Sequence, residues 1–401
     1  MRHTALLIAP LLALTPLLHA ADAEQIRRGE YLARIGDCVA CHTAPGGAAL
    51  AGGLPMETPV GAIYTTNITP DKDTGIGEYT LEDFTRAMRE GIARDGHHLY
   101  PAMPYPSFAK VSDDDIADLY AYFMHGVEPV SQPNKDADIP WPLSMRWPLA
   151  MWKMMFLKEG VYEADGDQSA EWHRGAYLVQ GLGHCGACHT PRGLAFQEKA
   201  LTEADDAYLS GATLDGWWAT SLRGDWRTGI GSLSVPTLVQ LLKTGFGDPL
   251  SVSGPMDDVI THSTTHLSDE DLTAMAVYLK SLSDQPATHT TRVNEPVLNG
   301  GELYSEYCAT CHRDNGAGYP GVTPALSGNP TVLADHSSSA IRVILYGARS
   351  PDTGAGNTQY AMPGYGWQLS DAQIAALVNY LNTRWGNQGD AVNEKDVASM
   401  R

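Results

Sequence analysis

All six cysteines of this 401-residue chain stand in three short motifs of one form, Cys-x-x-Cys-His. The motifs read CVACH, CGACH and CATCH and begin at Cys38, Cys185 and Cys308. A disulfide framework gives no reason for a histidine after every cysteine pair. A zinc site made from two of the pairs would leave the third pair and three histidines without a role. The pattern therefore calls for chemistry that uses two thiols and the following imidazole together.

Covalent haem attachment uses all of these groups. Two thioethers join the porphyrin to the chain, and the imidazole of the next residue binds the iron. The sequence therefore predicts three covalently bound haem c groups. The predicted attachment residues are Cys38, Cys41, Cys185, Cys188, Cys308 and Cys311, and the predicted iron ligands that follow them are His42, His189 and His312.

A second iron ligand is expected on the other face of each haem, and methionine is a common choice. Between His312 and the terminal tail the only methionine is Met362, in the loop QYAMPGYG. Met103 in LYPAMPYP and Met256 in SGPMDDV share this proline-flanked setting. The other candidates, Met88, Met124 and Met275, lie in helical patterns that favour core packing. We therefore predict Met103, Met256 and Met362 as axial ligands; bis-histidine ligation would instead use His97, His98, His262 or His266.

The haem motifs belong to a threefold repeat. Each motif ends a helical pattern that begins with glycine, and a middle helix, the methionine loop and a final helix follow it. Serines stand at the expected N-caps of the final helices, at Ser112, Ser268 and Ser370. The repeat predicts domains over residues 24–130, 167–285 and 296–388, linkers over 131–166 and 286–295, and a polar tail over 389–401.

The N-terminus predicts export. Arg2 precedes an apolar run from Ala5 to Leu18, and Ala21 and Ala23 form a cleavage pattern, so residues 1–23 read as a signal peptide. The formal charge of −20 argues against a nucleic-acid partner, which would need a basic face. Nothing in the sequence resembles a nucleotide-binding or substrate-converting motif, so no catalytic residue is predicted.

The first linker carries an unusually apolar segment, WPLSMRWPLAMWKMMFL, over residues 141–157. It can be a connector packed against its own haem domains. It can also be a patch for a catalytic subunit or a membrane surface, because large exposed apolar patches usually mark interaction sites.

Each repeat resembles a class I cytochrome c domain. Three in tandem behind a signal peptide resemble the three-haem cytochrome c subunit of bacterial periplasmic dehydrogenases that oxidise alcohols, aldehydes or sugar acids such as gluconate. The resemblance is strongest in CVACHTAPGGAALAGGLPMETPVGAIYTTNITPDKDTGIGEYT, in DGHHLYPAMPY and in WHRGAYLVQGLGHCGACHTPRG. It implies an all-α fold of three cytochrome c domains and a periplasmic location.

The resemblance also implies partners. The catalytic subunit would carry a flavin, a quinone-type cofactor or molybdenum, and the acceptor would be ubiquinone or another cytochrome of the respiratory chain. Some relatives end in a hydrophobic membrane-binding segment, whereas this chain ends in the polar RWGNQGDAVNEKDVASMR, so any membrane association would be peripheral. Two alternatives stay open: a freestanding electron shuttle, and a multi-haem peroxidase, against which three methionine ligands speak.

Overall fold

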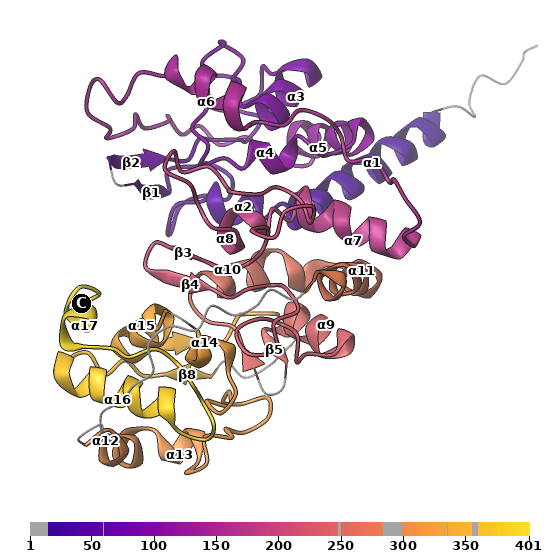
Figure 1. Ribbon diagram of the computed structural model, residues 1–401. Coiled ribbons are helices and arrows are strands. Elements are labelled where there is room, and N and C mark those ends of the chain that lie inside the picture. The colour runs from indigo at the N-terminus through magenta and orange to yellow at the C-terminus, as the bar shows by residue number, and fades with distance from the viewer. Residues whose placement is uncertain (1–14, 59, 248–249, 284–298, 335, 355–359) are drawn as a thin grey trace, which may run out of the picture.

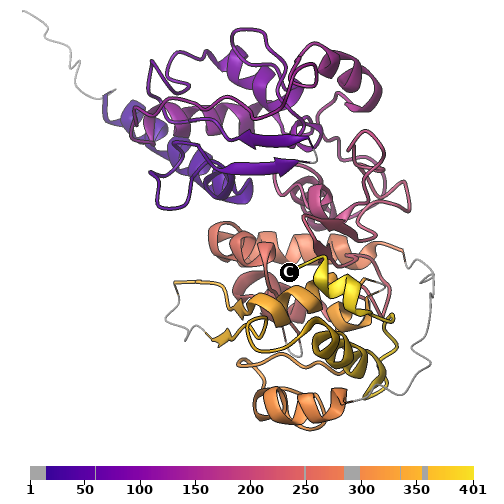
Figure 2. The same cartoon turned by 90° about the vertical axis from the view of Figure 1, so that its left-hand side faces the viewer.

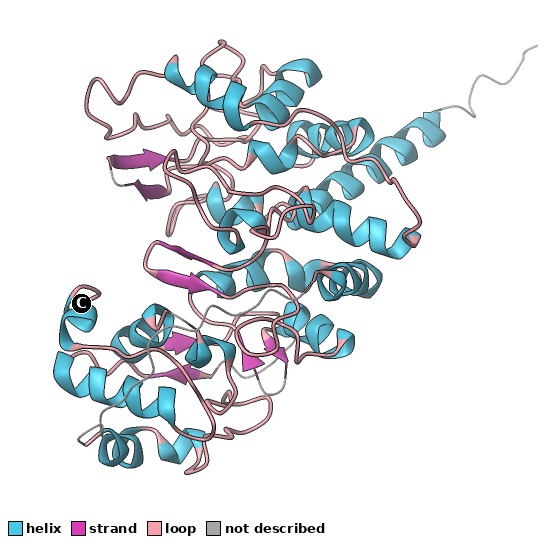
Figure 3. Ribbon diagram, viewed as in Figure 1, coloured by secondary structure: helices cyan, strands magenta, loops and turns pink. Residues whose placement is uncertain are grey.

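The computed structural model describes residues 15–58, 60–247, 250–283, 299–334, 336–354 and 360–401, with side-chain packing given from residue 23 onward. The predicted linker 286–295 and the first fourteen residues of the predicted signal peptide lie outside these ranges. The described chain is mainly helical, and its only sheets are four two-stranded ribbons (Figure 3). This confirms the predicted all-α class and adds short ribbons to it.

The first repeat contains five helices and one ribbon. They are α1 (Thr15–Ile35), α2 (Cys38–Cys41), β1 (Pro55–Thr58), β2 (Gly61–Tyr64), α3 (Leu81–Glu90), α4 (Tyr105–Phe108) and α5 (Asp113–His125). The linker that follows contains one helix, α6 (Pro148–Phe156).

The second repeat follows the same order with a second ribbon added. Its elements are α7 (Ala170–Gln180), α8 (Gly186–His189), β3 (Ala212–Leu214), β4 (Trp217–Ala219), α9 (Val235–Thr244), β5 (Phe246–Gly247), β6 (Leu250–Ser251), α10 (Pro255–His262), a 3₁₀ turn (Thr264–His266) and α11 (Asp269–Ser281). The third repeat contains α12 (Gly300–Tyr307), α13 (Ala309–His312), α14 (Pro330–Leu333), α15 (Ser338–Tyr346), β7 (Ala348–Arg349), β8 (Ala361–Met362), α16 (Asp371–Thr383) and α17 (Glu394–Ala398).

The final helix of each repeat begins at the predicted serine. The hydroxyl oxygens of Ser112, Ser268 and Ser370 each accept a hydrogen bond from the backbone N–H three residues on. This bond satisfies one of the N–H groups that a helix start leaves unpaired. The three predicted N-caps are therefore confirmed.

The first and last helices of a repeat pack closely because a glycine faces the partner helix. A Cβ at Gly29 of α1 would lie 1.9 Å from the carbonyl oxygen of Asp118 in α5. A Cβ at Gly175 of α7 would lie 2.0 Å from the carbonyl oxygen of Ala274 in α11. Any larger side chain would push the two helices apart, so Gly29 and Gly175 set the helix spacing in the first two repeats.

The first two repeats form one body. Their buried side chains make a single continuous core, whereas the third repeat has a core of its own. The three repeats follow one another from end to end, with the second in the middle (Figures 1 and 2).

A reciprocal pair of tyrosines joins the first two repeats. The Tyr31 hydroxyl of α1 donates to Asp271 of α11 at 2.7 Å and accepts from the backbone N–H of Ser268. In the other direction the Tyr177 hydroxyl of α7 donates to Asp115 and accepts from the backbone N–H of Ser112 at 3.1 Å. Each repeat thus completes the N-terminus of the other repeat's final helix, which fixes their relative orientation.

We expect Asp271→Asn to weaken the pH dependence of stability on the acid side. Burial acts to raise the pKa of Asp271, but hydrogen bonds from Arg174 and Tyr31 hold it below its ordinary value. Because the folded-state pKa is the lower one, the carboxylate stabilises the fold above its unfolded pKa of about 3.9. That stability is lost as pH falls through the folded value. The variant should lose about 1–2 kcal/mol at neutral pH, since Arg174 stays partly in water.

Urea unfolding of the haem-loaded protein between neutral and acidic pH measures this effect. Asp269→Asn is the matched control, because that carboxylate lies on the same helix, is exposed, and contacts only Lys243 at 3.6 Å. The control should change stability by a few tenths of a kcal/mol. Equal acid-side slopes in the two variants would contradict the role given to Asp271.

The third repeat docks on the β3–β4 ribbon of the second. The backbone N–H of Trp218 donates to the Ser339 hydroxyl at 2.8 Å, and that hydroxyl donates back to the Trp218 carbonyl. The Trp218 ring lies 4.9 Å from the His336 ring, measured between centroids. The Arg342 guanidinium lies over the neighbouring Trp217 ring. These contacts bring α15 against β4 and hold the third repeat in a defined place.

The C-terminal residues pack into the third repeat. Val397 of α17 is fully buried against the core that α16 shares. Arg401 donates to the Asp371 carboxylate at 2.7 Å and to the Leu369 carbonyl at 3.0 Å. The segment 389–401, expected as a polar tail, therefore contributes to the packing of this repeat.

Candidate haem sites

The three motif histidines share one hydrogen-bonding arrangement. The Nδ1 atom of His42 donates to the Thr66 carbonyl at 2.7 Å, that of His189 to the Thr220 carbonyl at 2.6 Å, and that of His312 to the Pro324 carbonyl at 3.0 Å. A carbonyl only accepts, so the proton sits on Nδ1 and the Nε2 lone pair is left for a metal. A second partner of this kind orients metal-binding histidines generally.

Electrostatics keep these imidazoles neutral. Burial lowers the pKa of His42, His189 and His312 below the ordinary value, and the carbonyl partner only partly offsets this. A histidine must be neutral to bind a metal, so the environment favours the ligating form at neutral pH.

The carbonyl partners are functional residues that sequence reasoning missed. Thr66 precedes the TGIG segment at Thr74 by eight residues, and Thr220 precedes the second TGIG segment at Thr228 by eight. The repeated TGIG is therefore a signal that could have indicated the supporting segment, which follows β2 in the first repeat and β4 in the second. The third repeat has no such segment, and nothing in its sequence indicated Pro324.

A backbone hydrogen bond closes the loop that follows each motif histidine. The backbone N–H groups of Gly52, Gly211 and Gly318 donate to the carbonyls of His42, His189 and His312 at 2.7, 2.8 and 3.1 Å. The chain after each histidine thus returns to the motif and closes a loop beside it. The same closure in all three repeats supports one function for all three.

The cysteines fit thioether formation better than zinc binding. Loss of contact with water raises the pKa of Cys38, Cys185 and Cys308 to about 12, so none of them is a stabilised thiolate. Within the described ranges no group of three or more His, Cys, Asp or Glu side chains is placed to hold a metal ion. The zinc alternative therefore has no support from the tertiary structure.

The predicted methionines lie at the edges of the cores that hold the cysteines. Met103 and Met256 border the core shared by the first two repeats, as Cys38 and Cys185 do. Met362 of β8 borders the third core, which contains Cys308. The structure brings each methionine to the correct repeat, and the pairing of each with an iron stays a prediction. Met88 and Met275 are buried in the core, as expected from their helical spacing.

Two of the alternative histidine ligands already have partners. The Nδ1 atom of His97 lies 2.5 Å from an oxygen of Asp95, and Nε2 of His266 lies 3.1 Å from the Thr261 carbonyl. The His266 contact engages Nε2 and so disfavours that histidine as an iron ligand, whereas the His97 contact leaves its Nε2 free.

Buried donors without a protein partner support a haem with its two propionates. In the Met103 loop, His98 Nδ1, Tyr100 Oη and Tyr105 Oη are buried and find no acceptor among the described residues. The same holds for Trp218 Nε1 on the ribbon that leads to Thr220. Buried donors rarely stay unpaired in native proteins, and carboxylate oxygens would satisfy them. The residues present therefore fit haem.

The first two haem motifs adjoin each other. Helix α2, which carries Cys38 and Cys41, contacts α10, which carries Met256 (Figure 1). The charge of Cys188 is among the causes that raise the pKa of Cys41, after desolvation and Asp37. The third motif, on α13, lies at the far end of the molecule (Figure 1).

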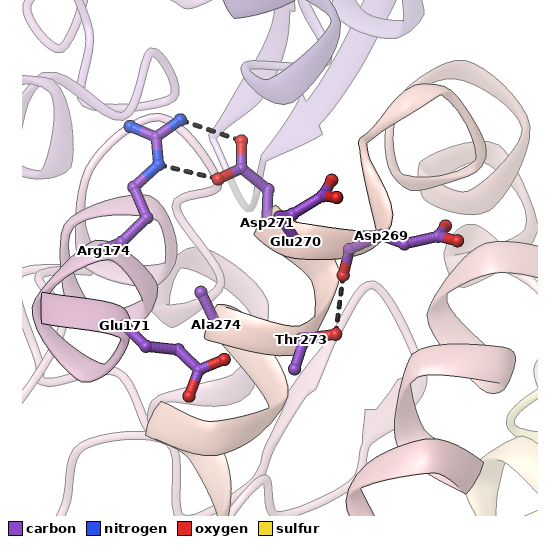
Figure 4. A pocket seen from close by; sticks show the side chains of 7 residues that line it. All are labelled: Glu171, Arg174, Asp269, Glu270, Asp271, Thr273 and Ala274. Carbon is purple, nitrogen blue, oxygen red and sulfur yellow. Dashed lines mark hydrogen bonds and ion pairs between the residues drawn. The ribbon is translucent and has the colours of Figure 1, made fainter. Parts of the chain in front are cut away.

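A depression of about 440 Å³ lies between α7 and α11 (Figure 4). Its lining is largely acidic, and its one cation, Arg174, is already held by two bonds to Asp271 at 2.7 and 2.8 Å. None of the haem-motif residues lines it.

Three CxxCH helices with matching histidine supports in a helical fold define a multi-haem c-type cytochrome. The Cytochrome c family model matches residues 26–126 and 297–385. The chain is 49% identical to the gluconate 2-dehydrogenase cytochrome c subunit of Pantoea cypripedii, over 95% of this chain and 90% of that protein. It is 48% identical to the alcohol dehydrogenase (quinone) cytochrome c subunit of Gluconobacter oxydans, over 96% and 84%.

The fructose dehydrogenase cytochrome subunit of Gluconobacter japonicus is 38% identical, over 96% of this chain and 84% of that protein. The chain belongs to this family, the cytochrome c subunits of gluconate, alcohol and fructose dehydrogenases. It is an electron-transfer protein that binds haem c at three motifs. In the described ranges no helix has both the length and the apolar character needed to cross a bilayer.

Proposed function

We propose that this chain receives electrons from a catalytic dehydrogenase subunit in the periplasm and passes them through three haems to ubiquinone or another cytochrome. The observation that carries the proposal is the fixed arrangement of three haem motifs, two of them adjoining, in one chain. The relatives named above are cytochrome c subunits of gluconate, alcohol and fructose dehydrogenases, which supports a partner that oxidises an alcohol, a sugar or a sugar acid.

Each haem would be held by one cysteine pair and one histidine, with Met103, Met256 and Met362 as the proposed axial ligands. Bound haem supplies an iron that gains and loses one electron. The residues of the chain orient the iron ligands and surround each site. The carbonyls of Thr66, Thr220 and Pro324 orient the imidazoles, and the cores around the motifs exclude water from one side of each site.

The proposed domains follow the repeats, 24–130, 167–285 and 296–388, after removal of a signal peptide over residues 1–23. The Trp218–Ser339 contact and the paired tyrosines keep the three sites at set separations. Dehydrogenation releases two electrons while each haem accepts one, so several sites in a fixed row let the donor discharge both. A freestanding shuttle would need only one site, so the fixed row favours a dedicated complex.

Co-purification with the catalytic subunit tests this function. We expect a tag on the cytochrome to recover the larger subunit at low detergent, and we expect the substrate to reduce the haems only in that complex. The isolated chain should be reduced by dithionite and should oxidise no alcohol, aldehyde or sugar acid.

Two outcomes would count against the complex. Recovery of the cytochrome alone, together with equally fast reduction by several unrelated donors, would favour a freestanding shuttle. Substrate turnover by the isolated chain would show a catalytic site that the sequence and structure give no sign of.

A further inference from the structure

A row of large apolar side chains stands exposed on the linker helix α6 and the turn before it. We name this the Trp/Met face; it consists of Trp141, Leu143, Trp147, Met151, Met154 and Met155. Trp141 is 80% exposed and Met154 is 81% exposed. Exposed apolar side chains in such number on one short segment usually mark an interaction site. Helix α6 lies at the outer end of the molecule, away from the third repeat (Figure 1).

The other side of α6 is firmly anchored, so the Trp/Met face is a fixed surface. The Lys153 ammonium is buried and donates to the Glu90 carbonyl at 2.7 Å. The Trp152 indole N–H donates to the Ala195 carbonyl at 2.8 Å, and its ring meets the Tyr105 ring edge-on. The segment is therefore a connector that packs on the haem repeats through Trp152 and Lys153, and its opposite side is exposed.

The apolar surface continues onto the second repeat. Leu194 and Phe196 flank Ala195, whose carbonyl binds Trp152, and both are exposed, Leu194 completely. The exposed surface therefore spans the first two repeats at the place where α6 joins them.

Charge makes this the part of the chain that suits an anionic surface. The segments that carry these exposed side chains, residues 141–158 and 194–197, contain no Asp or Glu, although the chain carries a net charge of −20; Glu159 and Glu198 directly follow them. Lys158 ends the segment and is exposed. The half-exposed Arg146 lies over the Tyr100 ring and donates to the His98 carbonyl at 3.0 Å. An anionic surface would repel the acidic remainder of the molecule and accept this face.

We propose that the Trp/Met face docks on a phospholipid bilayer that carries anionic headgroups, with α6 lying in the plane of the interface. Tryptophan and long apolar side chains beside Lys and Arg are the composition of helices that lie in a membrane interface. The exposed side chains lie on a helix and the turn before it at the outer end of the molecule, which suits insertion among lipid headgroups. A protein partner for this face is the alternative that the experiment distinguishes.

Docking in this way would place the first haem site next to the bilayer. Helix α6 lies against the loop that carries Met103, through the contact of Arg146 with His98 and that of Trp152 with Tyr105. Where the proposed function holds and the acceptor is ubiquinone, electrons would leave from the first repeat. The docking itself depends only on the surface described.

Vesicle binding of the haem-loaded chain tests the proposal. We expect co-sedimentation with vesicles of phosphatidylglycerol and phosphatidylcholine, weaker binding to phosphatidylcholine alone, and weaker binding at high salt. The double variant Trp147→Ser/Met154→Ser should lower the partition coefficient roughly tenfold or more, because two large apolar groups no longer enter the interface. Lys158→Glu should weaken binding to the anionic vesicles and leave binding to phosphatidylcholine unchanged.

The matched control is Trp226→Ser/Trp367→Ser, which removes two tryptophans that are 72% and 84% exposed elsewhere on the surface. It should bind vesicles like the unchanged chain. Haem spectra and thermal unfolding of both double variants check that the fold is intact. Equal vesicle binding by the two double variants would overturn the proposal. So would loss of co-purification with the dehydrogenase by Trp147→Ser/Met154→Ser without any vesicle binding by the unchanged chain, because the face would then belong to the protein partner.

Discussion

Replacing Cys185 and Cys188 by serine is expected to lower the covalent haem content from three per chain to two. Both thioethers of the second site are lost, and His189 alone would hold its haem only by the iron bond. Intact mass after acid–acetone extraction measures the change, because covalently attached haem stays with the polypeptide. The third repeat has a separate core, so its haem should be retained.

The same variant should interrupt electron flow along the chain. The second motif lies between the other two (Figure 1). On one side of the second repeat, α10 contacts α2 of the first repeat; on the other side, the β3–β4 ribbon contacts α15 of the third repeat. Ala187→Ser, between the two cysteines, keeps the motif and is the matched control with three haems expected. A double cysteine variant that still carries three haems would refute attachment at this site.

Met362→His is expected to lower one midpoint potential of the protein and leave the other two unchanged. A thioether ligand favours reduced iron more than imidazole does, so Met/His haems lie at raised potentials. The drop should be on the order of 0.1–0.3 V, a fraction of the roughly 0.8 V span that axial ligands cover. Because Met362 lies in a repeat with its own core, the change should stay local.

A spectroelectrochemical titration measures the potentials, and loss of part of the near-infrared sulfur-to-iron band gives a second readout. Met154→His is the control, since Met154 is exposed on α6 and lies outside the haem sites. Three unchanged potentials in Met362→His, with the near-infrared band intact, would remove Met362 from the ligand set and return bis-histidine ligation to consideration for the third site.

The sequence by itself determined the features that depend on a few neighbouring residues. The CxxCH motifs specify haem attachment because two thiols and an imidazole within five residues must meet one porphyrin. The helix starts at Ser112, Ser268 and Ser370 follow from a side-chain oxygen that reaches an N–H three residues on. The burial of Met275 follows from the helical spacing of its apolar neighbours. Each of these is local chemistry or local geometry, which a short stretch of residues fixes.

Only the tertiary structure decided which surfaces meet. The carbonyls that orient the histidines lie 24, 31 and 12 residues after the histidine in the three repeats, so no constant spacing predicts them. Arg192, three residues after His189, donates to the carbonyls of Ala187 and Phe196, which its position in the sequence does not indicate. Tyr31 crosses to Asp271 in another repeat, and Trp152 turns inward while Trp147 faces solvent. An amphipathic pattern predicts that a side chain will be buried. The residues that this side chain contacts depend on how whole helices pack, which is a property of the assembled fold.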